Sequence, residues 1–230
     1  GEPNMTQVTV TAQQVKSLRD RTGAGINDCR GALIETGGNE EKAVELIQKK
    51  GLAKAAKKAG AIAAEGRVLS YIHPNFRIGV LAEVNCQTDF AAKNEEFIQF
   101  ANDVVMHIAA SAPIYVKRDE MPAADIAKQR DLFAGQLEEE AKATGKSRPA
   151  EAIQKILDGK IDKWCSEVCL NEQELITRDD KKTVGAMSDE LTARIGEKIG
   201  VRRFIRFELG EGVEKKVVDF AAEVAEQLKA

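Results

Sequence analysis

The feature that most constrains the fold is a change of hydrophobic pattern between residues 78 and 108. Residues 78–84 form a mainly apolar run that is typical of a strand. From Phe97 to Ile108, apolar residues recur at three- and four-residue steps, which indicates an amphipathic helix. Asn94 can cap this helix, and the two glutamates that follow suit the positive end of its dipole. The sequence therefore predicts a strand-to-helix corner at residues 85–96.

The corner contains an acid and an aromatic residue, Asp89 and Phe90, where a connection is normally small or polar. In one interpretation Phe90 packs back under the helix as a hydrophobic staple and Asp89 caps the helix. In the other, both side chains point outward as a wedge for a partner, since aromatic anchors are typical interface hot spots. The usual behaviour of aromatics next to a helix favours the first interpretation.

Composition limits the class of protein. The chain has 230 residues, 31% charged and 5% aromatic, which fits a helix-rich globular protein of one or two domains. A net charge of −3 argues against a general nucleic-acid or membrane binder. Apolar runs of membrane-span length and the pattern of a signal peptide are both missing, so we expect a cytoplasmic protein. The four cysteines are expected to be reduced and buried.

The N-terminal part reads as three short helices. Thr11 and Gln14 have the spacing of a capping box. The segments Gly23-Ala24-Gly25 and Gly37-Gly38 interrupt the apolar pattern, and Asn39 can cap a third helix that ends near Gly51. A unit of this size usually serves for docking. Residues 52–64, rich in Ala and Lys, are interpreted as a solvated helical linker rather than a phosphate-binding strip.

The remaining pattern predicts an α+β core with a three-stranded antiparallel sheet. Two strands lie within residues 66–84 around a His-Pro-Asn turn, and a third covers 201–209 after a helix at 183–199. Two long helices between about 122 and 170 suggest a helical hairpin. We therefore predict three units: a helical module at 5–55, a core at 56–210 and a C-terminal helix at 211–230.

Sites for covalent chemistry are not apparent. Gly145-Lys146-Ser147 imitates the end of a phosphate-binding loop, but Glu140 occupies the position of its first glycine. Cys165 and Cys169 share a helical face and are interpreted as buried thiols rather than metal ligands. No set of nucleophile, base and acid is visible, so a binding protein without metal or cofactor is expected.

Several separated motifs carry a resemblance to a known family. They are residues 18–25 (LRDRTGAG) with Asp28-Cys29, 54–60 (KAAKKAG), 77–81 (RIGVL), 85–90 (NCQTDF) with Ala92-Lys93-Asn94, and 205–212 (IRFELGEG). Together they resemble the elongation factor Ts family, guanine-nucleotide exchange factors for elongation factor Tu in bacteria and organelles. The resemblance covers almost the whole chain after Met5, and it implies a bacterial cytoplasmic protein rather than an organellar one. It implies an N-terminal module similar to ubiquitin-associated (UBA) domains, followed by the core, the hairpin and the C-terminal helix.

The resemblance also implies roles for individual residues. Asp89 and Phe90, with Thr88 and Ala91 around them, would enter the nucleotide-binding domain of elongation factor Tu near its Mg²⁺ and phosphate-binding elements. Contacts to the same domain would come from Arg19, Ile26, Asn27 and Arg30 of the helical module. Contacts to the third domain of elongation factor Tu would come from His73, Leu175 and Ile176.

The implied mechanism needs no nucleotide site, metal or cofactor in this chain. The factor binds elongation factor Tu in its GDP-bound and nucleotide-free forms, and by reciprocity it lowers the affinity of elongation factor Tu for the nucleotide. Position 91 is Ala where the family usually has Val, so this side chain is expected to hold the wedge in place slightly less firmly. Longer members carry two core modules, so this chain acts either as a monomer or as a homodimer. The alternative function is a non-catalytic UBA-like docking protein for nascent chains or other helical ligands, and a third class is an enzyme that uses Cys165 and Cys169.

Overall fold

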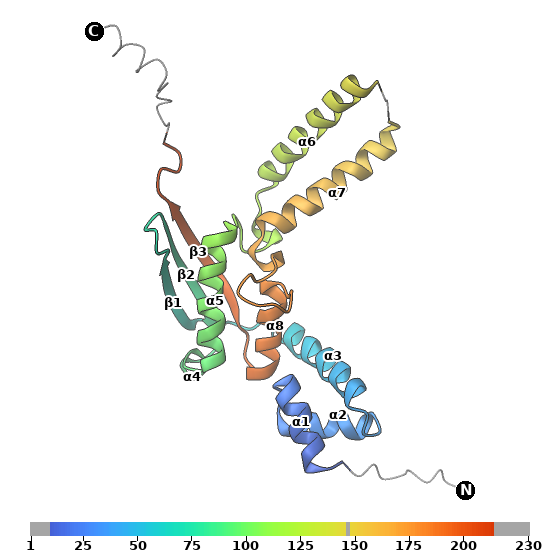
Figure 1. The fold of residues 1–230 in the computed structure, drawn as a ribbon, viewed down its shortest axis with the longest axis vertical. Coiled ribbons are helices and arrows are strands. Elements are labelled where there is room, and N and C mark those ends of the chain that lie inside the picture. The colour runs from blue at the N-terminus through green and yellow to red at the C-terminus, as the bar shows by residue number, and fades with distance from the viewer. Residues whose placement is uncertain (1–9, 146–147, 214–230) are drawn as a thin grey trace, which may run out of the picture.

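The computed structural model describes residues 10–145 and 148–213, and it has the predicted mixed α+β architecture (Figure 1). A three-helix module leads into a three-stranded sheet, which is covered by helices, and a helical hairpin extends away from this core. Residues 214–230, which hold most of the predicted C-terminal helix, lie outside the described residues. Within the described part of the chain, no helix is both long and apolar enough to cross a membrane.

The N-terminal module consists of α1 (Ala12–Thr22), α2 (Ile26–Glu35) and α3 (Glu40–Lys58). The predicted caps are confirmed: Thr11 and Gln14 form a capping box, and the Asn39 side chain accepts from the Lys42 amide. The prediction that the third helix ends near Gly51 is wrong, because α3 continues to Lys58. Its packing on α8 (Val184–Ile195) explains why: a Cβ at Gly51 would lie 3.2 Å from Ala193 Cβ, so glycine permits the close approach that offsets its low helix propensity.

The sheet contains β1 (Glu65–Ile72), β2 (Ile78–Cys86) and β3 (Gly200–Glu208) in the order β1-β2-β3. Both pairings are antiparallel, as predicted, with a register shift at Glu83/Val84 opposite β3. Gly66 has φ +142°, and a Cβ there would lie 2.1 Å from the Val84 carbonyl oxygen. Only glycine fits this close approach of two strands.

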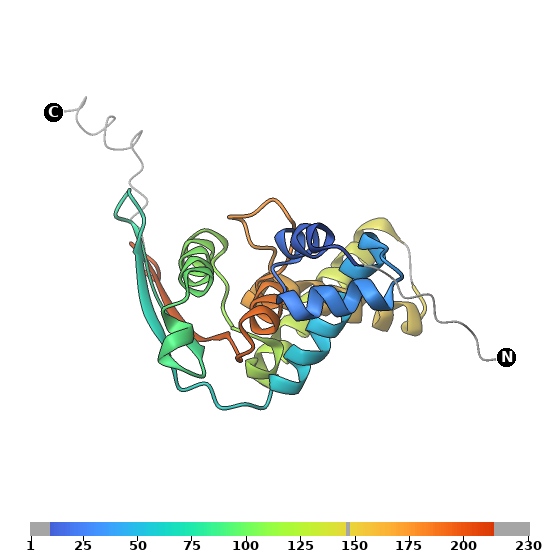
Figure 2. The ribbon, with the colours of Figure 1, turned by 90° about the horizontal axis from the view of Figure 1, so that it is seen from below.

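One face of the sheet packs against α5 (Glu95–Ser111), and α8 packs on the far side of α5. Figure 2 shows this sequence of layers from the sheet through α5 and α8 to the N-terminal module. The core is made of apolar side chains from β2, α5 and α8, including Val84, Phe97, Phe100, Ile108 and Leu191. The prediction of a helix to Ile199 is wrong, because Gly196 adopts a left-handed conformation and ends α8 at Ile195.

The predicted helical hairpin is confirmed as α6 (Ala123–Thr144) and α7 (Ala150–Val168), which extend away from the sheet (Figure 1). Pro122 precedes α6 at its N-cap, as expected for a residue that begins a helix. Leu137 and Leu157 are buried along the hairpin, and Arg130 pairs with Asp158 at 2.8 Å across it. The base is a small apolar cluster that includes both Cys165 and Cys169.

Candidate partner-binding site

The strand-to-helix corner contains an additional short helix, α4 (Asp89–Ala92). Thr88 is its N-cap, and the Thr88 hydroxyl oxygen accepts from the Ala91 amide at 3.3 Å. Ala91 and Ala92 face the core, whereas Phe90 is 78% exposed. The interpretation of Phe90 as a buried staple is therefore wrong, and the corner presents an aromatic side chain to solvent.

Lys93 sets the electrostatics of the exposed corner. Its ammonium lies 2.7 Å from the Asp89 carboxylate and 5.6 Å from the centroid of the Phe90 ring. The hydrogen bond from Lys93 lowers the pKa of the Asp89 carboxyl below its ordinary value. One cation thus contacts both residues of the predicted wedge and keeps Asp89 ionised.

The polar residues that precede the wedge anchor the corner to distant parts of the chain. The Asn85 side chain donates to the Ala63 carbonyl oxygen at 3.0 Å, and the Lys198 amide donates to the Gln87 side chain at 2.9 Å. The Glu197 carboxylate accepts from both the amide and the hydroxyl of Thr88. Glu197 follows Thr88 by 109 residues, so no local sequence pattern could have assigned it to the corner.

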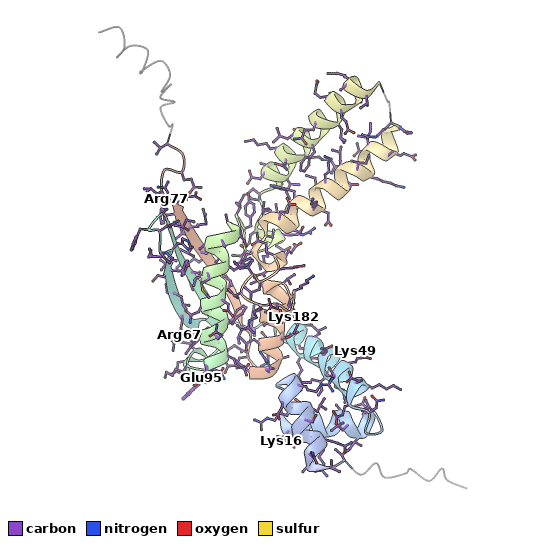
Figure 3. All side chains as sticks on the ribbon, in the orientation of Figure 1. Lys16, Lys49, Arg67, Arg77, Glu95 and Lys182 are labelled. Carbon is purple, nitrogen blue, oxygen red and sulfur yellow. The ribbon has the colours of Figure 1, made fainter. Side chains whose placement is uncertain are left out.

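A further contact fixes the far end of α4. The Arg67 guanidinium, from β1, donates to the Ala92 carbonyl oxygen at 2.6 Å. Figure 3 labels Arg67 at this end of the sheet, near Glu95, and Arg77 at the opposite end. The exposed wedge therefore stands on a base that is hydrogen-bonded on several sides.

The residues predicted to contact a partner from the helical module form a second surface. Arg19 lies on α1, and Ile26, Asn27 and Arg30 lie on α2 just after the Gly23–Gly25 turn. All four are exposed, and Ile26 is 56% exposed. A Cβ at Gly23 would lie 2.7 Å from Arg194 Cδ, so this turn sits directly against α8.

The remaining predicted contact residues lie apart from the corner. His73 is half-buried in the β1–β2 turn and its Nδ1 is 3.0 Å from the Tyr71 hydroxyl. This turn is at the other end of β1, roughly 25 Å from the corner for eight residues at about 3.3 Å per residue. Leu175 is buried in the core, whereas Ile176 is 56% exposed. Of the latter two, only Ile176 presents its side chain to a partner.

The loop that carries Ile176 is held against α5 by two buried polar residues. The Ile176 amide donates to His107 Nδ1 at 3.3 Å, and His107 Nε2 lies 2.9 Å from the Gln173 side-chain oxygen. One turn earlier, Asp103 accepts two hydrogen bonds from Arg178. Burial lowers the pKa of His107 and so favours the neutral ring, which can accept from the Ile176 amide.

The cysteines are all buried and free, as predicted. Burial raises the pKa of Cys165, and it raises the pKa of Cys169 to about 11. Since the thiolate is the reactive form, these environments suppress nucleophilic chemistry at the hairpin base.

Comparison with known proteins places this geometry in a family. The family model described as "Elongation factor TS" matches residues 10–211. The chain belongs to the elongation factor Ts family. It is 52% identical over 221 residues to elongation factor Ts of Desulforamulus reducens, covering 96% of this chain and 99% of that protein. It is 50% identical over 218 residues to elongation factor Ts of Geobacter metallireducens, covering 95% and 98% respectively.

Family membership agrees with the resemblance that the separated motifs carry, and it extends through the helical module, the sheet and the hairpin. Elongation factor Ts of Carboxydothermus hydrogenoformans shows a similar likeness, 51% identity over 220 residues. The matched residues include the whole corner, the Ile176 loop and Glu197.

Proposed function

We propose that this chain binds elongation factor Tu in its GDP-bound form and promotes GDP release by inserting Asp89 and Phe90 near the Mg²⁺ and phosphate site. The exchange role comes from membership of the elongation factor Ts family. The observation that carries the mechanism is the 78% exposure of Phe90 on a short helix anchored to the core. An apolar ring of this size is exposed at a cost unless a partner covers it.

In this mechanism the chain acts by differential binding. Phe90 fills an apolar space that exists only when the partner's phosphate site is displaced, and Asp89 presents a negative charge there. By reciprocity, the factor lowers the partner's affinity for nucleotide by the same amount as nucleotide lowers the partner's affinity for the factor. Such coupling energies are typically ~1–3 kcal/mol. The step is non-covalent, so no nucleophile of this chain takes part.

The other exposed surfaces are proposed to add affinity. Ile26, with the neighbouring polar residues Arg19, Asn27 and Arg30, would contact the nucleotide-binding domain of the partner, while His73 and Ile176 would contact its third domain. Leu175 supports Ile176 from within the core. Because the relatives named above come from bacteria, the proposal places this activity in a bacterial cytoplasm.

We also propose that the protein is a homodimer through the outer face of its sheet. That face carries a row of exposed apolar side chains: Val68 and Ile72 on β1, Leu81 on β2, and Ile205 and Phe207 on β3. Gly79 lies between Ile72 and Phe207 in the register, and a Cβ at Gly79 would lie 3.2 Å from Ile72 Cδ1, so the Ile72 side chain covers this glycine and continues the apolar row.

Competition between nucleotide and factor tests the exchange mechanism at equilibrium. Nucleotide-free elongation factor Tu should bind this chain, and added GDP with Mg²⁺ should dissociate the complex in a concentration-dependent way. Substituting Ile26→Asp should weaken the complex without lowering the maximal rate of GDP release, because Ile26 lies outside the wedge. The docking-protein alternative predicts different results. In that case GDP should not change the binding of elongation factor Tu to this chain, and Ile26→Asp should abolish the binding.

A further inference from the structure

The carboxylate of Glu197 makes two hydrogen bonds to one residue of the corner. Its Oε2 accepts from the Thr88 amide at 2.9 Å, and its Oε1 accepts from the Thr88 hydroxyl at 2.7 Å. Glu197 directly follows Gly196, whose left-handed conformation ends α8 and turns the chain toward β3. Hydrogen bonds to an ionised acceptor are about twice as strong as neutral ones. This pair fixes both the backbone and the side-chain rotamer of Thr88.

Thr88 passes this constraint on to the wedge. Because its hydroxyl proton is directed at Glu197, an oxygen lone pair is left to accept from the Ala91 amide, which is the N-cap bond of α4. A helix of four residues has no stability of its own, so its direction depends on its cap and its anchors. The two side chains of α4 that face the core are alanines, which offer little packing area.

The adjacent residue strengthens the same connection. The Lys198 amide donates to the Gln87 side chain at 2.9 Å, and the Lys198 ammonium donates to the Ala59 carbonyl oxygen at 2.5 Å. Ala59 caps the C-terminus of α3. Residues 197–198, in the short connection between α8 and β3, therefore form hydrogen bonds both to the corner and to the C-terminal end of α3.

We propose that Glu197 is a positioning residue of the exchange wedge: by clamping Thr88 it holds α4 in the direction that presents Phe90 to the partner. The proposal rests on the proposed exchange function. Glu197 does not contact the partner itself. It acts through Thr88, and its loss lets α4 rotate, so that Phe90 enters the partner less often after binding has occurred.

The test compares Glu197→Ala, Glu197→Gln and a matched control, Glu190→Ala. Glu190 lies on α8, which ends two residues before Glu197, and its substitution removes a comparable charged contact, the 2.8 Å pair with Lys182. Stopped-flow release of fluorescent GDP from elongation factor Tu gives the maximal rate and the half-saturating concentration of each variant. Glu197→Ala should lower the maximal rate about tenfold, the order expected for lost charge-assisted hydrogen bonds, and leave the half-saturating concentration nearly unchanged.

Glu197→Gln keeps one carbonyl oxygen as an acceptor and should recover part of the rate, while Glu190→Ala should match the wild type. The double variant Phe90→Ala/Glu197→Ala should be no slower than Phe90→Ala within about twofold, because residues that act as a unit are not additive. A full maximal rate in Glu197→Ala overturns the proposal. So does a double variant whose losses multiply, since Glu197 would then act independently of the wedge.

A measurement on the free protein separates this proposal from the exchange function itself. Hydrogen exchange at the Thr88 amide should be about tenfold faster in Glu197→Ala than in the wild type or Glu190→Ala, because the amide loses its acceptor. If the wild type fails to accelerate GDP release, the exchange function is overturned. Hydrogen exchange at the Thr88 amide then tests the role of Glu197 independently. An unchanged hydrogen-exchange rate in Glu197→Ala overturns that role.

Discussion

Truncation of Phe90 separates a wedge from a structural aromatic. A buried Phe→Ala change usually costs ~3–5 kcal/mol of folding stability. Phe90 is 78% exposed, which leaves about a fifth of its surface in contact with the protein. Scaling by that fraction gives a cost below about 1 kcal/mol. For a chain of this size, that corresponds to a fall in melting temperature of at most about 2–4 °C.

The effect on exchange should be much larger than the effect on stability. Removing a central aromatic anchor from an interface costs typically ~2–4 kcal/mol, which corresponds to roughly 30-fold to nearly 1,000-fold in rate. Phe90→Ala should therefore slow the maximal release of GDP from elongation factor Tu by at least about 30-fold. Thermal unfolding and stopped-flow GDP release, carried out on the same preparation, measure both quantities.

Leu132→Ala is a suitable control for this prediction. Leu132 is 54% exposed on α6, and none of the proposed contacts involves it. Its truncation should leave both the melting temperature and the release rate close to the wild-type values. The wedge assignment is refuted if Phe90→Ala lowers the melting temperature by much more than about 4 °C while GDP release stays fast, because Phe90 would then be a packing residue.

Four further outcomes are expected. Asp89→Asn should slow exchange and barely change stability, because the exposed pair with Lys93 contributes little to folding; unchanged exchange in a folded variant contradicts this. His107 has a pKa below its ordinary 6.5, so the unfolded chain binds the extra proton first as pH falls, and urea unfolding should show stability declining from pH 7 to 5. His107→Gln should flatten that decline, whereas a parallel profile argues against the assignment. Phe207→Glu should convert a dimer to a monomer in analytical ultracentrifugation, and a monomeric wild type at tens of micromolar ends the dimer proposal. Under native conditions, iodoacetamide should modify the four buried cysteines slowly and without loss of GDP-exchange activity, whereas rapid inactivation would favour thiol chemistry.

Sequence pattern predicted the elements around the corner well. The Asn94 cap and the apolar positions from Phe97 to Ile108 follow from local hydrogen bonding and helix periodicity, and both are present. The predicted end of α3 is wrong, because contact with α8 outweighs the helix-breaking tendency of Gly51. Such contacts join residues that are far apart in the chain, and no local pattern reports them.

The candidate site could be located from sequence but its geometry could not. Whether Phe90 faces solvent depends on α4, a helix too short to produce a periodic signal. Leu175 and Ile176 are adjacent apolar residues with opposite burial, which is set by the fold around them. The role of Glu197 depends on a contact across 109 residues. These three features required the three-dimensional structure.

This chain is proposed to accelerate GDP release through its corner. The decisive measurement is the stopped-flow release of a fluorescent GDP from cognate elongation factor Tu at increasing concentrations of this protein. A concentration-dependent acceleration is expected, which saturates and is largely lost in Phe90→Ala. A folded wild-type protein that leaves the release rate unchanged at every concentration would contradict it.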